Sequence, residues 1–311
     1  MLWLEHKLSI GGYIFPAVNQ VSWTSSREGG DIITIKLPKY KRLSYSAIPE
    51  GTKIEFWCGY KQFGINLEFE GFVREVSPKQ PFTIIAEDYF YFLRREVVSK
   101  TFKNMTAGDI INYLCNPYPI DTGIVNKGIK IKNRNYHVKT KRFIIKDLAV
   151  LCGFDAFMYF NALHFEKPFS IVQKNIPVFT IGKNIIEDDI TFSPDPEYDK
   201  IIIFSEQTDG SGIVYTAQYG NGQRIKKIYI EDIPQNEIKS RAKELYDEIT
   251  YKGFKGTITT FGYPSVMHST KIKIVDDRYP EKSGYYFVDK VEKEYGNNGF
   301  RQKIYVGKKV S

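Results

Sequence analysis

Three pairs of neighbouring carboxylates are the first candidates for catalysis in this sequence, because glycoside hydrolysis uses two acidic residues. The pairs are Glu87-Asp88, Asp188-Asp189 and Asp276-Asp277. Each pair lies at or just beyond the end of an expected strand, where acidic residues commonly keep a loop in contact with water. A β-rich enzyme that cleaves glycans is therefore one alternative, but the sequence assigns no catalytic residue.

The histidines, cysteines and glycines form none of the familiar catalytic or metal-binding patterns. No His-x-x-x-His or Glu-flanked histidine spacing is present, and three cysteines are too few for a disulfide framework. The glycines between residues 210 and 222 lack the Gly-Lys-Ser/Thr ending of a phosphate-binding loop. We therefore expect no enzyme activity, no cofactor and no metal site. The histidines and cysteines are His6, His137, His164, His268, Cys58, Cys115 and Cys152.

A basic segment, residues 127–146, is the strongest charge feature of the chain, whose net charge is +8. It contains no acidic residue, so it can form a solvated face, bind an acidic protein surface or bind nucleic acid. A nucleic-acid-binding β protein that also uses Tyr136 and Phe143 is a second alternative. The possible docking surface consists of Lys127, Lys130, Lys132, Arg134, Lys139, Lys141, Arg142 and Lys146.

Composition predicts that strands position most of these residues. Tyr, Phe and Trp make up 15% of the 311 residues, and aromatic side chains suit the half-buried surface of a sheet. Residues 1–100 alternate apolar and polar side chains in short runs bounded by Gly or Pro, which is typical of a small sandwich or barrel. No apolar run reaches the roughly 18 residues needed to cross a bilayer, so we expect no membrane insertion by this chain.

The middle of the chain predicts two short helices. Thr106-Ala-Gly-Asp109 has the spacing of a capping box, and Asn116-Pro117 ends the helix that follows it. An apolar stripe from Ile144 to Leu151 forms one face of a second helix, and Gly153 stands where its C-terminal cap belongs.

Beyond residue 200, strands return with one helix between them. Lys200–Phe204 and Gly212–Tyr219 are expected to form a hairpin through a turn at 208–211. Apolar residues from Ile238 to Ile249 recur at three- and four-residue steps, which predicts a helix near 235–252 that Gly253 closes.

An internal repeat suggests that the chain contains two similar β domains. Both copies have the order strand, loop, strand opening on Gly, loop, strand. The matching segments are Thr52–Phe56 and Thr270–Ile274, Gly71–Val76 and Gly284–Val291, and Phe82–Ala86 and Gln302–Val306.

The expected fold is mainly β with a mixed α+β insert. Residues 1–100 form a first small β-barrel domain, residues 101–195 the insert, and residues 196–311 a second β-barrel domain with an inserted helix. Strand alternation places four side chains in the barrel cores. These are Ile54, Phe56, Ile272 and Ile274.

The order of these pieces resembles the late control gene D family, the tail hub proteins of contractile-tailed phages, to which the hub part of type VI secretion spikes is related. Met267-His-Ser-Thr270 departs from the Pro-Gly turn that the family often has before the strand. The segments that carry the resemblance are Ile48–Tyr60, Phe69–Val76, Ile84–Phe90, the helix after Thr106, Ile144–Phe154, Leu163–Phe165, Gly284–Val291 and Gly299–Val306.

The resemblance implies a structural function: a baseplate hub that joins the tail tube to the central spike. In this family, three subunits with two similar barrels each form a ring of six. The implied partners are further copies of the chain in a homotrimer, a tail tube protein, a spike protein and other baseplate subunits, with no specific nucleic acid. The spike, and any lysozyme-like module, is expected to be a separate polypeptide.

The resemblance also implies a location. The N-terminal residues Met1–Lys7 carry charges where a signal peptide needs an apolar stretch. We therefore expect assembly in the cytoplasm of a host bacterium, followed by incorporation into the baseplate of a virion tail or injection particle.

Overall fold

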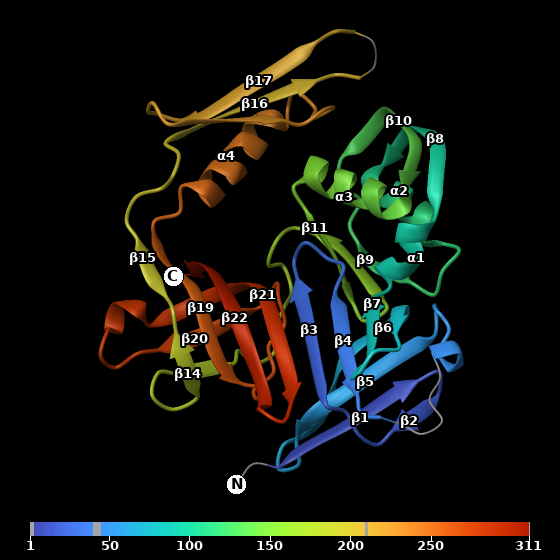
Figure 1. The fold of residues 1–311 in the computed structure, drawn as a ribbon. Coiled ribbons are helices and arrows are strands. Elements are labelled where there is room, and N and C mark those ends of the chain that lie inside the picture. The colour runs from blue at the N-terminus through green and yellow to red at the C-terminus, as the bar shows by residue number, and fades with distance from the viewer. Residues whose placement is uncertain (1–2, 40–44, 209–210, 311) are drawn as a thin grey trace.

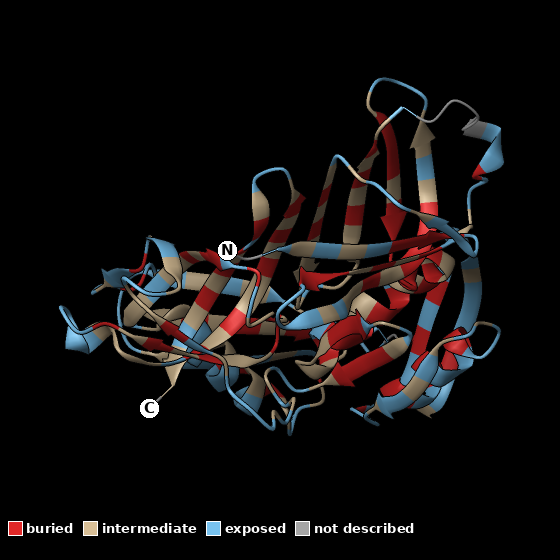
Figure 2. Cartoon of the chain, turned by 90° about the horizontal axis from the view of Figure 1, so that it is seen from below, coloured by how far each residue is buried: buried red, intermediate tan, exposed pale blue. Residues whose placement is uncertain are grey.

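The structure is a computed structural model that describes residues 3–39, 45–208 and 211–310. It is mainly β, with several sheets and four α-helices in the described residues, as expected from the composition. None of these helices has the length and apolar character of a membrane span. Buried and exposed residues alternate along many strands (Figure 2), which is the pattern of sheets that cover a core with one face.

The N-terminal β unit is built from seven strands. In β4 the burial alternates residue by residue, as its sequence Ile-Ile-Thr-Ile-Lys-Leu predicts. The strands are β1 (Leu4–Ile10), β2 (Tyr13–Phe15), β3 (Gln20–Ser26), β4 (Ile32–Leu37), β5 (Lys53–Tyr60), β6 (Gly64–Ser77) and β7 (Phe82–Glu87), with a short 3-10 helix η1 (Tyr45–Ala47).

The middle region, residues 88–166, has both predicted helices. The capping box is present, since the Thr106 side chain accepts from the Asp109 amide and the Asp109 side chain accepts from the Thr106 amide. Gly153 caps the second helix with φ of 68°. The elements are α1 (Phe90–Arg95), β8 (Val97–Thr106), α2 (Ala107–Cys115), β9 (Asp121–Val125), β10 (Lys130–Thr140), α3 (Lys141–Cys152), β11 (Asp155–Tyr159) and β12 (Ala162–Glu166).

A three-stranded sheet with one helix follows. The predicted hairpin is confirmed as β16 (Lys200–Glu206) paired with β17 (Val214–Gly220), and β18 (Ile225–Tyr229) pairs with β16 on its other side. Residues 209–210 of the predicted turn lie outside the described residues. The helix α4 (Ile238–Ile249) ends at Thr250, so Gly253 does not close it but begins a strand. Buried residues of this sheet and helix share one apolar core with the middle region.

The C-terminal β unit combines two separate stretches of the chain. Its strands are β13 (Val178–Thr180), β14 (Ile185–Asp188), β15 (Thr191–Ser193), β19 (Gly253–Phe261), β20 (Lys271–Val275), β21 (Gly284–Gly296) and β22 (Gly299–Val310), with a 3-10 helix η2 (Pro280–Lys282). The first three strands lie in the part of the chain that we assigned to the insert, yet they pair with β19 and β20.

The two β units repeat one strand order. In the N-terminal unit, β5, β6, β7 and β4 are successive neighbours, and β20, β21, β22 and β19 follow the same order in the C-terminal unit. The registers also agree, because Val73 opposes Ala86 as Val288 opposes Val306. Both pairs are followed by a shift of register of one residue, a β-bulge, at the same place in β6 and β21.

The turn before β5 and β20 repeats as well. The Gly51 amide donates to the Val73 carbonyl, and the Ser269 amide donates in the same way to Val288. Gly51 has φ of 84° and Ser269 has φ of 59°, so a serine adopts the left-handed conformation that glycine adopts in the first copy. The predicted match of Gly71 with Gly284 is wrong. Matching registers align Gly71 with Tyr286, since Gly71 faces Ile54 and Tyr286 faces Ile272.

The two units are joined by a continuous sheet instead of forming two closed barrels. The path runs β14-β19-β22-β21-β3-β4-β7-β6-β5-β1-β2, with β21 beside β3 (Figure 1). The two units share one sheet because β21, with 13 residues, is long enough to pair with strands of both. Its first part pairs with β20, and its last part extends beyond β20 and pairs with β3.

Candidate functional site at the junction of the two β units

The β3–β21 junction, defined as Gln20–Ser26 paired with Lys290–Gly296, joins the repeated units. The pairing is antiparallel and uses all seven residues of β3. It brings together segments from the two ends of the chain, blue and red in Figure 1. The relative position of the repeated units is therefore set by a backbone ladder.

Aromatic side chains fix the core face of this junction. Trp23 of β3 stacks on Phe300 of β22 with ring centroids 5.9 Å apart. Tyr295 and Phe300 belong to the core of the N-terminal unit although the C-terminal unit supplies them. The Tyr60 hydroxyl also donates to the Phe300 carbonyl over 2.8 Å. Shared core residues make the junction rigid because each unit would lose packing without the other.

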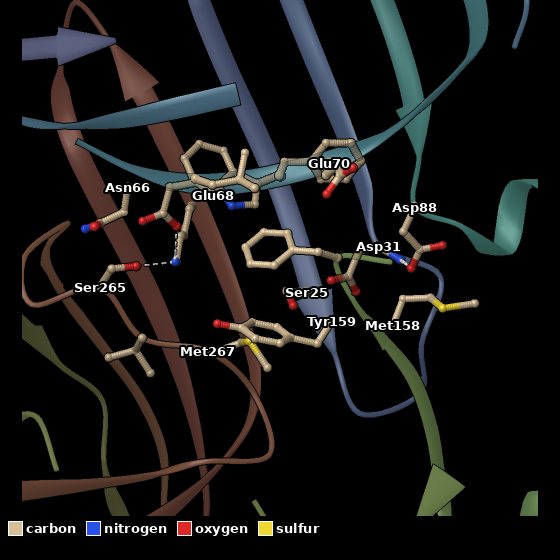
Figure 3. A pocket seen from close by; sticks show the side chains of 16 residues that line it. Ser25, Asp31, Asn66, Glu68, Glu70, Asp88, Met158, Tyr159, Ser265 and Met267 are labelled. Atoms are coloured by element: carbon tan, nitrogen blue, oxygen red, sulfur yellow. Dashed lines mark hydrogen bonds and ion pairs between the residues drawn. The ribbon is translucent and has the colours of Figure 1, made fainter. Parts of the chain in front are cut away.

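A buried ion pair crosses the junction beside a cavity of about 430 Å³ (Figure 3). The Lys293 amine lies 2.5 Å from Glu68 Oε2 and donates to Ser265 Oγ over 2.7 Å. The two charged side chains are 7% and 4% exposed. Because both are removed from water, loss of one partner would leave the other as an uncompensated buried charge.

Two further carboxylates at the cavity hold the backbone. Asp88 accepts from the Asp31 amide over 2.8 Å and from the Phe90 amide over 2.8 Å, and Asp31 accepts from the Ser26 amide. Loss of water contact raises the pKa of Asp88 to about 7. Burial, and to a smaller extent the nearby Asp88 charge, raises the pKa of Asp31 well above its ordinary value. The carboxylates lining this cavity therefore serve structural contacts, and Glu70 does so too by pairing with Lys53.

The opposite face of the junction is polar. Ser22 and Thr24 alternate with Trp23 along β3 and so point away from the core. The Gln20 side chain connects Lys36 and Glu294 through two hydrogen bonds of 2.7 Å each. Opposite charges are thus interspersed on this face.

The four side chains predicted to face the β cores are all completely buried, at 0% exposure. Ile54 and Phe56 pack in the core of the N-terminal unit. Ile272 and Ile274 pack in the core of the C-terminal unit.

The basic segment is less exposed than the sequence suggested. Arg134 and Lys141 are 8% and 7% exposed, so they are not part of a basic surface. Arg134 binds Asp147 and Asp232, and Lys141 binds Glu96.

Arg142 is half-buried and forms an ion pair with Glu87, while Lys146 is half-buried at a surface cleft. The exposed basic residues are Lys127, Lys130, Lys132 and Lys139.

The carboxylate pairs considered for catalysis also have structural contacts. Glu87 binds Arg94 and Arg142, and Asp188 binds Lys282. Asp276 accepts from the amides of the turn that follows it.

The cysteines and His268 lie in surroundings that favour their neutral forms. Among the described residues, no three His, Cys, Asp or Glu side chains gather in a metal-binding group. Burial raises the pKa of Cys115 to about 12 and that of Cys152 to about 11, which disfavours the nucleophilic thiolate. Burial lowers the pKa of His268 to about 3, so its imidazole stays neutral.

Arg27 and Lys293 are two further cations that hold distant parts of the chain together, and no sequence pattern pointed to them. Arg27 follows β3 and binds Asp155 of the middle region and Asp289 of β21. These partners are 128 and 262 residues away in sequence. No local pattern identifies such pairs, and β21 carries both the exposed Lys290 and the buried Lys293.

Comparison with known proteins gives structural relatives only. No protein-family model and no curated protein sequence matches the chain. The 43 kDa tail protein of prophage MuSo2 from Shewanella oneidensis superposes with a TM-score of 0.72 at 15% identity, covering 97% of this chain and 96% of that one. A tail protein from Neisseria meningitidis gives 0.72 at 14% identity, covering 98% and 97%.

A third similar structure comes from another particle. An Escherichia coli component of the type VI secretion system, described as structurally similar to the T4 bacteriophage tail proteins gp27 and gp5, gives a TM-score of 0.65 at 10% identity, covering 98% of this chain and 79% of that one. The chain therefore has, over nearly its whole length, the fold that prophage tail proteins share with components of type VI secretion systems.

Proposed function

We propose that this chain is the baseplate hub of a contractile phage tail or a related injection particle. In this role it joins the tail tube to the central spike and acts as a structural protein without enzymatic activity. It assembles in the bacterial cytoplasm and then becomes part of the particle. The likeness to tail proteins over at least 97% of the chain supports this proposal.

The repeat of β6-β7 in β21-β22, including the bulge, is the observation that carries the proposal. A tube of six-fold symmetry and a spike of three-fold symmetry need an adaptor with both. Three copies of a chain with two similar units present six similar surfaces around a three-fold axis. The doubled β unit thus provides the match between tube and spike.

The polar face of the β3–β21 junction is the surface that we place toward the lumen of this ring. Ser22, Thr24 and the balanced charges around Gln20 would let a polyanion or a protein pass without strong binding. A lumen dense in positive charge would instead retain nucleic acid through many phosphate contacts.

The exposed lysines of the basic segment are assigned to the outside of the ring. They would contact acidic surfaces of other baseplate subunits there. Their binding should weaken with added salt, because exposed charges are screened over about 8–10 Å at moderate ionic strength.

The mass of the purified protein in solution tests the hub proposal. Light scattering should give about 108 kDa, three times the chain mass of 36.0 kDa. Duplex DNA should not bind at physiological salt. A monomer at every concentration tested, or DNA binding with a steep logarithmic salt dependence, would overturn the proposal.

A further inference from the structure

The β14–β15 stretch of the C-terminal unit has a free edge at β15. β14 and β15 both pair with β19, and Ile185 of β14 also forms a bridge with Ile181, whereas no described strand pairs with the other side of β15. Phe192 in β15 is 56% exposed. An unpaired edge strand with an exposed aromatic residue is a template for pairing with another chain.

This stretch is the counterpart of β3, the strand that makes the internal junction. Ile35 of β4 and Ile258 of β19 occupy equivalent positions in the two β units. Ile35 opposes Ile84 of β7, and Ile258 opposes Ile304, the equivalent residue of β22. Val21 of β3 faces Ile35, just as Asp188 of β14 faces Ile258.

The equivalence continues along both strands. Thr24 faces Ile32 in the N-terminal unit, and Thr191 faces Lys255 in the C-terminal unit. The register is the same as at Val21 and Asp188, so Thr191 is equivalent to Thr24. Between these positions, Trp23 and Ile190 are both buried, at 4% and 3% exposure. Phe192 therefore holds the place that Ser25 holds in β3.

The end of β6 is the counterpart of the part of β21 that binds β3. Val76 opposes Ile84 as Val291 opposes Ile304, so Val76 is equivalent to Val291. Val291 uses its other side to pair with Ser25. On the equivalent side of β6, residues 75–77 have no strand partner among the described residues, because the pairing of β6 with β5 ends at Phe72.

We propose that β15 of one copy pairs with the end of β6 of the next copy, in the register of the internal β3–β21 junction. Phe192 then lies opposite Val76, with Ser193 opposite Glu75 and Thr191 opposite Ser77. The pairing is head-to-tail and therefore closes into a ring or continues as a filament. It rests on the proposed hub function, for which it names the contact between copies.

The contact between copies is shorter than the junction within the chain. β15 has three residues and β3 has seven. Pro78 lacks the amide needed to continue the ladder beyond Ser77. The Phe192–Val76 contact is accordingly the main apolar contribution, and the ring is held less firmly than each subunit.

Cysteine crosslinking between different chains tests the register. One chain carries Phe192→Cys and the other Val76→Cys, and the two are mixed and oxidised. Directly opposed strand residues have Cα atoms about 4.5–5.5 Å apart, which suits a disulfide. A crosslinked dimer should form with this pair and not with Phe192→Cys mixed with Glu75→Cys, because neighbouring residues point to opposite faces. Single variants alone control for Cys58, Cys115 and Cys152.

Charge substitution gives a second, independent measurement. Phe192→Asp should raise the dissociation constant of the oligomer roughly 10- to 100-fold, the effect of losing a buried phenylalanine. Tyr279→Asp is the matched control, since Tyr279 is also 56% exposed but lies outside the proposed contact. It should leave the constant unchanged.

The outcomes separate the two proposals. A trimer that neither crosslinks through Phe192→Cys and Val76→Cys nor responds to Phe192→Asp would overturn this pairing and leave the hub function standing. Crosslinking of the Glu75→Cys control in place of Val76→Cys would also overturn the proposed register. A protein that remains monomeric would overturn both proposals.

Discussion

Replacement of Lys293 by methionine is the most direct perturbation of the junction between the β units. Methionine retains most of the volume but removes the charge from a pair in which Lys293 and Glu68 are 7% and 4% exposed. Breaking a buried ion pair typically costs about 3–5 kcal/mol, because the remaining charge has no partner. We therefore expect Lys293→Met to lower the free energy of unfolding by about 3–5 kcal/mol.

The same strand offers a matched control. Lys290 pairs with Glu292 over 2.6 Å, and these side chains are 37% and 39% exposed. Because water screens this pair, Lys290→Met should change stability by no more than about 1 kcal/mol. Denaturant unfolding followed by circular dichroism measures both variants.

A double-mutant cycle then assigns the cost to the pair. Glu68→Met combined with Lys293→Met leaves no buried charge, so the double variant should recover much of the loss, with a coupling of about 2 kcal/mol or more. A cost below about 1 kcal/mol for Lys293→Met, or simple additivity in the cycle, would refute the assignment of a buried, tightly coupled pair.

Three other predictions concern the cavity, the core and the basic segment. The pKa of Asp88 is raised to about 7 from 3.8, so the folded state keeps a proton that the unfolded state loses, and stability should fall as pH rises from about 4 to about 7. Asp88→Asn should flatten this slope in unfolding titrations across that range, whereas an unchanged slope would contradict the assignment. Phe56→Ala should cost roughly 3–5 kcal/mol in denaturant unfolding, and a loss well under 1 kcal/mol would contradict its core position. Charge reversal of Lys130, Lys132 and Lys139 to glutamate should weaken binding to baseplate partners in pull-down assays without unfolding the protein, and unchanged binding would exclude these lysines from the docking surface.

Local features of the fold could be predicted from the sequence because they depend on neighbouring residues. The capping box at Thr106 and the left-handed cap at Gly153 each need only one helical turn of sequence. The burial of Ile54 and Ile272 follows from strand alternation in the same way. The failed match of Gly71 with Gly284 has a local cause too, since alternation fixes the face of a residue but not its register against a distant strand.

The junction could not be predicted, because its contacts join distant parts of the chain. Trp23 pairs with Lys293 across the ladder, and nothing near either residue identifies the other. Arg134 looked like part of a basic surface, but Asp232, 98 residues away, neutralises it in the fold. Net charge in a segment therefore overstated the exposed charge, because buried cations have partners that only the tertiary structure reveals.

Electron microscopy of the purified oligomer tests the central claim, that two repeated β units in each of three chains form one ring. Averaged end-on views should show three-fold symmetry with six similar densities at one radius, since the β6-β7 and β21-β22 segments have the same register and bulge. A ring of any other symmetry, or three-fold particles whose two β units lie at clearly different radii, would contradict the account.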